Sequence, residues 1–169
     1  MRVIRYSATH ALALGVALTG MTCALAADIR IASAEARFGL VFVRLGLAGS
    51  DMGATFLLPR LIGVGHASEF LLTGEIIDAA RAERIGLVNR VVPADRLAAE
   101  VRELALRLAA GPPIGMAVTK RALNRSLGID IDEDLDYEAY AQSKCMLTDD
   151  HREGVKAHLE KRPPRFTGR

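Results

Sequence analysis

A run of small apolar residues at positions 11–27 constrains this chain more than any other feature, because it contains no charged residue. A segment that is apolar on every side suits a helix buried all round. The chain has 169 residues, half of them hydrophobic and a quarter charged, which is enough to build a core around such a helix. The run therefore predicts a buried helix over residues 15–27 of one globular unit.

The same run has a second interpretation as a secretory leader. Arg2 and Arg5 precede it, and Ala24-Leu25-Ala26 resembles a cleavage site for small residues. The run is marginal for a membrane span, which needs roughly 20 apolar residues. Because it continues without a break into residues 28–33, we favour a structural helix and a cytoplasmic protein. A secreted or periplasmic protein, with residues 1–26 as the signal peptide, is the alternative.

Charge and composition disfavour several kinds of partner. The net charge is +2, from 22 basic and 20 acidic residues, and Trp is absent, so nothing favours nucleic acid. The two cysteines are isolated, and the four histidines lack the spacing of metal ligands. We therefore expect no metal site, no nucleic acid and no membrane as partner.

Short strands and loops are predicted between residues 28 and 93. Apolar alternation and short apolar runs predict strands, Pro59 predicts the end or a bend of a helix, and Gly86 the end of another. The expected elements are strands at 29–31 and 37–43, a loop at 45–53, helices at 52–62, 65–72 and 79–85, a turn at 73–78 with Asp78 as N-cap, and an extended piece at 87–92.

The rest of the chain is predicted to be helical. Residues 95–110 carry an apolar stripe at helical spacing, formed by Leu97, Val101, Leu104 and Leu108. Gly-Pro-Pro at 111–113 ends that helix, and further helices are expected at about 114–126, 132–147 and 149–160. The basic tail 161–166 contains two prolines and is predicted to be non-helical.

Four stretches, in this order and at this spacing, resemble the crotonase superfamily, also called the enoyl-CoA hydratase/isomerase family. They follow the small-residue helix and are 27–32 with 36–39; 53–55 with 58–63; 72–74 with 77–79 and 86–93; and Asp150, Glu153 and Gly154 with 160–163 and Phe166. The resemblance covers roughly residues 15–169 and leaves residues 1–14 unmatched. It corresponds to the C-terminal portion of the family domain, without its N-terminal half.

The resemblance implies an α/β fold, the C-terminal part of a crotonase-like ββα superhelix followed by a helical trimerisation region. Family members bind acyl-CoA thioesters and stabilise a thioester enolate, for hydration or isomerisation in fatty-acid or related acyl-CoA metabolism. No cofactor is expected, because coenzyme A is part of the substrate. A homo-trimer or hexamer is the expected assembly.

Backbone N–H groups at the start of a buried helix hold the enolate oxygen in this family, because unpaired N–H groups at a helix N-terminus favour negative charge. By resemblance the substrate-binding donors here are Thr19 and Gly20, at a helix start within residues 15–21. A helix-packing glycine is the alternative role for Gly20. The two glutamates that hydratases use as acid and base correspond to Thr22 and Phe42, which cannot ionise.

Asp51 is the candidate catalytic residue. It lies in Gly49-Ser50-Asp51-Met52-Gly53, at a loop position where isomerase-like members of the family carry a catalytic aspartate. Asp is also a frequent N-cap, so a capping role for a helix that begins at Met52 is the alternative.

Lys161 and Phe166 correspond to a region of the family that lies near coenzyme A, and are candidate CoA contacts. Lys120 and Lys156 could also face its phosphates, although surface lysines are mostly only solvated. Two functional hypotheses remain open. The chain is an acyl-CoA hydratase (a lyase) or isomerase, or it is a non-catalytic remnant that oligomerises or binds a partner.

Overall fold

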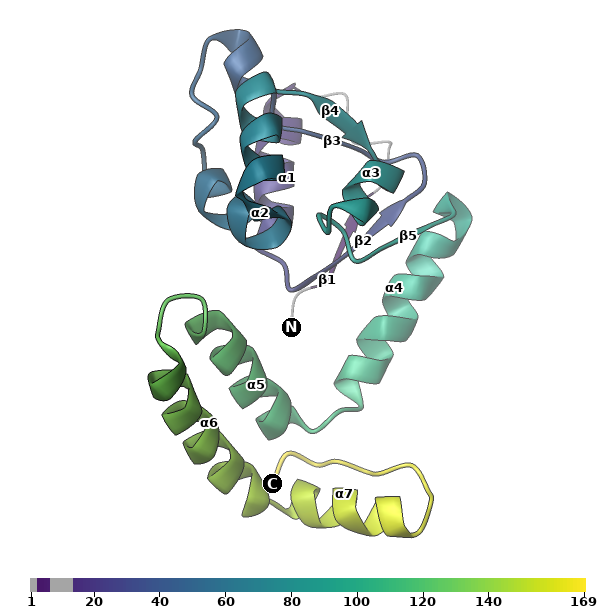
Figure 1. Ribbon diagram of the computed structural model, residues 1–169. Helices are drawn as coiled ribbons and strands as arrows, with labels where there is room; N and C mark the ends of the chain where they lie inside the picture. Colours follow the sequence, from purple (N-terminus) through teal and green to yellow (C-terminus); the bar gives the residue numbers. More distant parts are fainter. Residues whose placement is uncertain (1–2, 7–13) are drawn as a thin grey trace. The chain divides into compact units, whose positions relative to one another are not determined.

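The apolar run forms helix α1 (Leu14–Leu25) in the computed structural model, which describes residues 3–6 and 14–169 (Figure 1). The helix connects two parallel strands, β1 (Val3–Tyr6) and β2 (Ile29–Ser33), and β5 (Arg90–Val92) pairs with the other side of β2, also in parallel. Sequence reasoning missed β1, which belongs to the segment 1–14 that resembled nothing. The remaining residues of that segment, apart from Leu14, lie outside the described part.

A second small sheet pairs β3 (Arg37–Gly39) with β4 (Ile76–Asp78) in antiparallel register. Phe38 lies opposite Ile77, and both are buried. The predicted strand 37–43 is therefore too long, because the chain leaves the sheet after Gly39 and forms a 3-10 helix, η2 (Val41–Leu45). The predicted turn 73–78 is wrong in its second half, which is strand β4.

Helix α2 (Ala54–Thr73) joins two segments that the sequence predicted as separate helices. The predicted break at Pro59 is wrong, because the helix continues through this residue. Proline has no N–H group to donate to the carbonyl of Thr55, one turn earlier, but Thr55 is exposed and its carbonyl can bond to water. The break is at Gly63, whose φ of 77° and ψ of 158° are not helical. That backbone conformation is accessible almost only to glycine.

Helix α3 (Ala79–Arg84) begins and ends as its sequence predicts. The side chain of Asp78 accepts a hydrogen bond from the N–H of Arg81 at 2.8 Å, which confirms it as the N-cap. Gly86, with φ of 80°, follows the C-cap in the left-handed conformation typical of a C′ glycine. The predicted extended piece ends in β5, directly before Pro93.

The core lies within the first part of the chain and is built from α1, α2, α3 and both sheets. Its largest fully buried side chains are Phe70, Ile31, Leu40, Leu58 and Leu87. Helix α1 contributes Met21 and Leu25 to this core. The prediction of a helix buried all round is wrong at Cys23, which is exposed.

One cation is buried beside this core. Arg30 on β2 is only 6% exposed, and its Nε and one terminal nitrogen donate to the carbonyls of Leu87 and Ala27, both at 2.6 Å. Burial lowers the pKa of Arg30, and the nearby charge of Asp28 opposes that effect. The Asn89 side chain accepts from the Arg30 N–H at 2.8 Å, and the Asn89 N–H donates to the Arg30 carbonyl at 2.9 Å.

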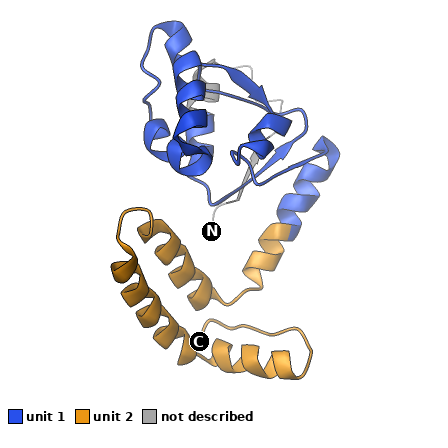
Figure 2. Ribbon diagram, in the orientation of Figure 1, with its two compact units in different colours: residues 1–103 blue, residues 104–169 orange. Residues whose placement is uncertain are grey.

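The chain divides into two compact units, Met1–Glu103 and Leu104–Arg169 (Figure 2), where a single unit was expected. Helix α4 (Ala94–Ala109) begins in unit 1 and ends in unit 2. Unit 2 continues with α5 (Pro113–Arg125), α6 (Ile131–Met146) and α7 (Asp149–Leu159), within two residues of their predicted ends. Asp130 and Thr148 cap α6 and α7 by accepting from the N–H groups of Glu133 and His151.

Within residues 3–6 and 14–169, no helix combines the length and the apolar character needed to cross a bilayer.

Two neighbouring glycines of α2 give a stability test of the break. Gly63→Ala should destabilise the protein by about 1–3 kcal/mol, because alanine is strained at that φ and ψ. Gly65→Ala is the matched control, since Gly65 is helical and an added methyl group meets no atom within 4 Å. It should stabilise by about 0.5–1 kcal/mol. Urea unfolding of both variants measures the difference, and equal effects would contradict the assignment of the break.

Candidate active site

Asp51 lies in the loop that connects η2 with α2. Gly46 ends η2 with a left-handed φ of 72°, and Met52 and Gly53, with φ of 45° and 87°, turn the chain into α2. The Asp51 side chain is half-buried, while its carbonyl accepts from the N–H of Ala54 at 2.9 Å. Gly53 is the N-cap of α2, so the alternative role of Asp51 as side-chain N-cap is wrong.

Met52 is one of two non-glycine residues with positive φ in the described part of the chain. Such a conformation costs on the order of 1–3 kcal/mol and persists where the surrounding structure imposes it. Here it directly follows Asp51, so the local backbone is held in a strained turn beside the candidate proton carrier.

The two positions that correspond to the hydratase glutamates are both buried. Thr22 on α1 is 2% exposed and Phe42 on η2 is 7% exposed. Phe42 packs within the hydrophobic core cluster. An aromatic ring and a buried threonine leave no ionisable group at either position, so no water-activating carboxylate pair can form there.

Thr19 and Gly20 are the sixth and seventh residues of α1, which runs from Leu14 to Leu25. The helix thus begins just before the expected range of 15–21. Only the first four N–H groups of a helix lack a partner inside it, so the N–H of Gly20 falls where helical hydrogen bonds are made. The side chain of Thr19 lies outside the described residues.

Unit 1 holds Gly20 and Asp51 in one packed body. Helix α1 packs against α2, and α2 packs against η2, which precedes the Asp51 loop (Figure 1). The other two predicted site residues, Lys161 and Phe166, belong to unit 2. Lys161 is exposed and has a left-handed φ of 52°, whereas Phe166 is half-buried.

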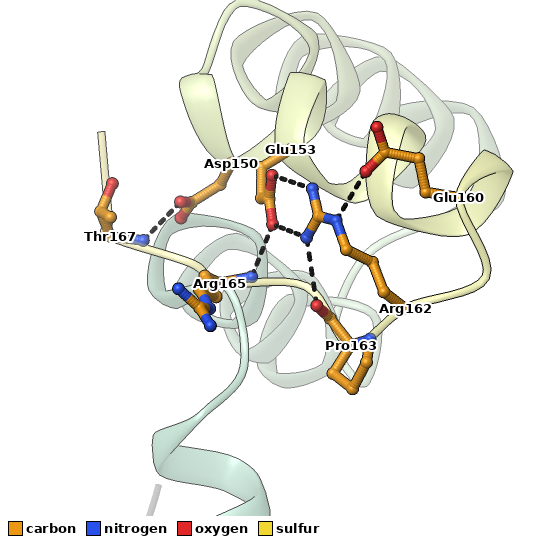
Figure 3. Close-up of polar contacts among 7 residues, drawn as sticks. All are labelled: Asp150, Glu153, Glu160, Arg162, Pro163, Arg165 and Thr167. Carbon is orange, nitrogen blue, oxygen red and sulfur yellow. Dashed lines mark hydrogen bonds and ion pairs between the residues drawn. The ribbon is translucent and has the colours of Figure 1, made fainter.

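The chain after α7 folds back along that helix, and we call residues 162–169 the tail strap. Asp150, 4% exposed on α7, accepts from the N–H of Thr167 at 2.6 Å (Figure 3). It also accepts from the N–H of Gly168 at 2.9 Å. In the other direction, the N–H groups of Asp149 and Asp150 donate to the carbonyl of Arg169 at 2.7 and 3.2 Å.

A second carboxylate, Glu153, holds the start of the tail strap. Its two oxygens accept from both terminal nitrogens of Arg162, at 2.6 and 2.9 Å, and one of them also accepts from the N–H of Arg165 at 2.8 Å (Figure 3). The hydrogen bonds from Arg162 and then from the Arg165 N–H lower the pKa of Glu153 to about 2. Arg162 also pairs with Glu160 at 2.6 Å.

Phe166 forms part of the wall of an apolar groove of about 450 Å³ in unit 2. The groove is lined by the start of α5, the end of α6 and one side of α7, including Ile114, Cys145, His151 and Leu159. In the described part of the chain, no three His, Cys, Asp or Glu side chains converge so as to hold a metal ion.

Asp150 and Glu153 are functional candidates that sequence reasoning did not select, although both belong to the fourth quoted stretch. The acidic residues of that stretch, followed by Arg162 and Phe166, could have indicated their contact with the tail. Periodicity gave no such signal, because the tail is irregular.

The family model described as enoyl-CoA hydratase/isomerase matches residues 11–169. The chain is 40% identical over 147 residues to the crotonyl-CoA hydratase of Syntrophomonas wolfei subsp. wolfei, covering 87% of this chain and 56% of that protein. It is 42% identical over 141 residues to the short-chain-enoyl-CoA hydratase of Clostridioides difficile, covering 83% and 90%. The crystal structure of enoyl-CoA hydratase from Bacillus anthracis superposes with a TM-score of 0.86, at 37% identity, over 90% of this chain and 58% of that one.

The chain spans a little over half the length of the Syntrophomonas relative and of the Bacillus structure. These similarities confirm the resemblance and the fold class that the four stretches predicted, the C-terminal portion of a crotonase fold.

The lowered pKa of Glu153 predicts a pH-dependent contribution to stability. Because its pKa in the folded protein, about 2, lies below the ordinary value of about 4.3, the contribution is complete above that value. It is lost as the pH falls toward 2. The free energy of unfolding of the wild type should therefore exceed that of Glu153→Gln at pH 7, and the difference should shrink between pH 4.5 and 2.5 in urea titrations.

Asp149→Asn is the control for this titration. Asp149 lies on the same helix, is exposed, and pairs only with Arg152 among the contacts of its side chain. A wild-type advantage over Glu153→Gln that stays constant as the pH falls would contradict the prediction.

Proposed function

Because the chain belongs to the enoyl-CoA hydratase/isomerase family, we propose that it binds an acyl-CoA thioester and stabilises the enolate formed from it. One observation carries the choice of chemistry. Of the three positions considered for proton transfer, only Asp51 bears an ionisable group, while Thr22 and Phe42 are buried. We propose Asp51 as the proton carrier.

A single carboxylate favours isomerisation over hydration. In a double-bond shift, one base removes a proton from the thioester-activated carbon and returns it to another carbon, so the enolate is the only charged intermediate. Hydration by the usual route needs two groups, a base that takes a proton from the attacking water and an acid that gives a proton to the substrate. The proposed reaction is therefore a proton shift in an enoyl-CoA, with the hydratase activity of the relatives as the second candidate.

The enolate oxygen needs N–H donors, and we propose the backbone of Thr19 and Gly20. Donors aimed at developing charge contribute strongly to catalysis. Since these residues follow the first turn of α1, their N–H groups become available only if residues 14–18 leave the helix when acyl-CoA binds. Lys161 and Phe166 are proposed contacts of the coenzyme A moiety.

A homo-oligomer is the proposed assembly. Several large apolar side chains of unit 2 are exposed, and surfaces of this kind commonly mark contacts with another protein. They are Leu123, Leu127, Ile131, Leu135, Met146 and Leu147.

The alternative function is a non-catalytic remnant that oligomerises or binds a partner. The buried Thr22 and Phe42 favour it, because they remove the acid and base of hydration. Turnover of any enoyl-CoA by the folded chain would exclude it.

The role of Asp51 predicts a selective loss of turnover. Asp51→Asn keeps the size of the side chain but cannot accept a proton, so turnover of enoyl-CoA thioesters should fall by about 10²–10⁴-fold. Binding of a saturated acyl-CoA, measured by calorimetry, should stay unchanged.

Glu35→Gln is the matched control, because Glu35 is an exposed carboxylate of unit 1 in the turn between β2 and β3. It should leave turnover unchanged. Wild-type turnover in Asp51→Asn would remove Asp51 from the mechanism.

A further inference from the structure

Both oxygens of the Asp150 carboxylate accept hydrogen bonds from the backbone of the tail strap. Asp150 is 4% exposed. One oxygen accepts from the N–H of Thr167 (Figure 3), and the other accepts from the N–H of Gly168. A buried carboxylate is expensive unless it is hydrogen-bonded, and hydrogen bonds to a charged acceptor are short and strong. Asp150 therefore fixes the path of residues 167 and 168 along α7.

Phe166 is held from both sides by this arrangement. The preceding N–H, of Arg165, donates to Glu153, and the following N–H, of Thr167, donates to Asp150. The backbone of Phe166 thus lies between two anchored peptide groups, which fixes the position from which its ring leaves the tail strap.

The ring lies over a glycine. A Cβ added to Gly154 would lie 3.6 Å from one ring carbon of Phe166 and 3.9 Å from another, which is ordinary van der Waals distance. The space between ring and helix therefore admits a methyl group, and a larger side chain there would displace the ring. Since Phe166 is half-buried and lines the apolar groove, part of its ring is open to a ligand on the groove side.

We propose that Asp150 is a positioning residue for acyl-CoA binding, which acts by holding Phe166 over Gly154 at the groove. This inference rests on the proposed function, in which Phe166 contacts the coenzyme A moiety. Asp150 also lines the groove, but both of its carboxylate oxygens bond to the tail strap, so the role proposed for it is to position Phe166. The aromatic ring is suited to stacking on the adenine end of the coenzyme.

A purely structural role for Asp150 would weaken every ligand equally, so the test compares two ligands. Butyryl-CoA carries the nucleotide, and butyryl-pantetheine has the same thioester without it. Calorimetry with the full chain gives the dissociation constant of each for the wild type, Asp150→Ala and Asp149→Ala. Asp149 is the control because it is the adjacent acid of the same helix turn, is exposed, and pairs with Arg152.

Asp150→Ala should raise the dissociation constant of butyryl-CoA by about tenfold, the size of a lost stacking contact on an aromatic ring. That of butyryl-pantetheine should stay within twofold. Asp149→Ala should change neither. Amide hydrogen exchange at Thr167 and Gly168 should accelerate in Asp150→Ala and not in Asp149→Ala.

A second variant displaces the ring without removing the carboxylate. Gly154→Leu leaves Asp150 in place but puts a larger side chain into the space beneath the Phe166 ring. It should reproduce the selective loss of butyryl-CoA affinity.

The outcomes separate the two proposals. If the wild type binds butyryl-CoA but Asp150→Ala weakens both ligands equally or neither, the positioning role is wrong and the proposed function stands. If the folded wild type binds neither ligand, the proposed function fails and the positioning role fails with it.

Discussion

A buried guanidinium connects the elements on which the candidate site of unit 1 depends. Arg30 reaches from β2 to the carbonyl of Ala27, just after α1, and to the carbonyl of Leu87, just before β5. Neither carbonyl accepts a hydrogen bond within a sheet or a helix. Without the Arg30 side chain, each carbonyl would be left unsatisfied, which costs roughly 1–3 kcal/mol for a buried polar group. Arg30 thereby fixes the end of α1 against the sheet, and the position of Gly20 along that helix follows.

In unit 2, negatively charged side chains hold an irregular segment in place. Asp150 and Glu153 satisfy backbone N–H groups of a tail that has no regular structure to pair them. In both units an irregular segment is held by a charged side chain from a regular element. Charged groups suit this task because their hydrogen bonds are about twice as strong as neutral ones. The cost is that each charge must remain paired in the folded protein.

The sequence predicted the parts of the fold in which local chemistry decides the outcome. Helix α4 follows from its apolar stripe and from the Gly-Pro-Pro breaker after it, and the cap at Asp78 follows from residue type. Predictions from local sequence failed where contacts between distant parts of the chain determine the structure. Strand β1 pairs with a strand more than twenty residues away, and its Arg5 supported only the alternative interpretation of a leader. Arg30 alternated with isoleucines like an exposed strand residue, and its burial follows from carbonyls that only the fold brings near.

The candidate site was also predicted only in part from the sequence. The position of Asp51 in a loop between two predicted elements follows from sequence, whereas the left-handed turn at Met52 and Gly53 beside it does not. Thr22 and Phe42 were known to lack a charge, and the structure adds that both are buried. Restoring a carboxylate at Phe42 would place it within the apolar core, where its ionised form is strongly disfavoured. Because Thr22 also lacks an ionisable group, the hydratase pair cannot be regained by one substitution.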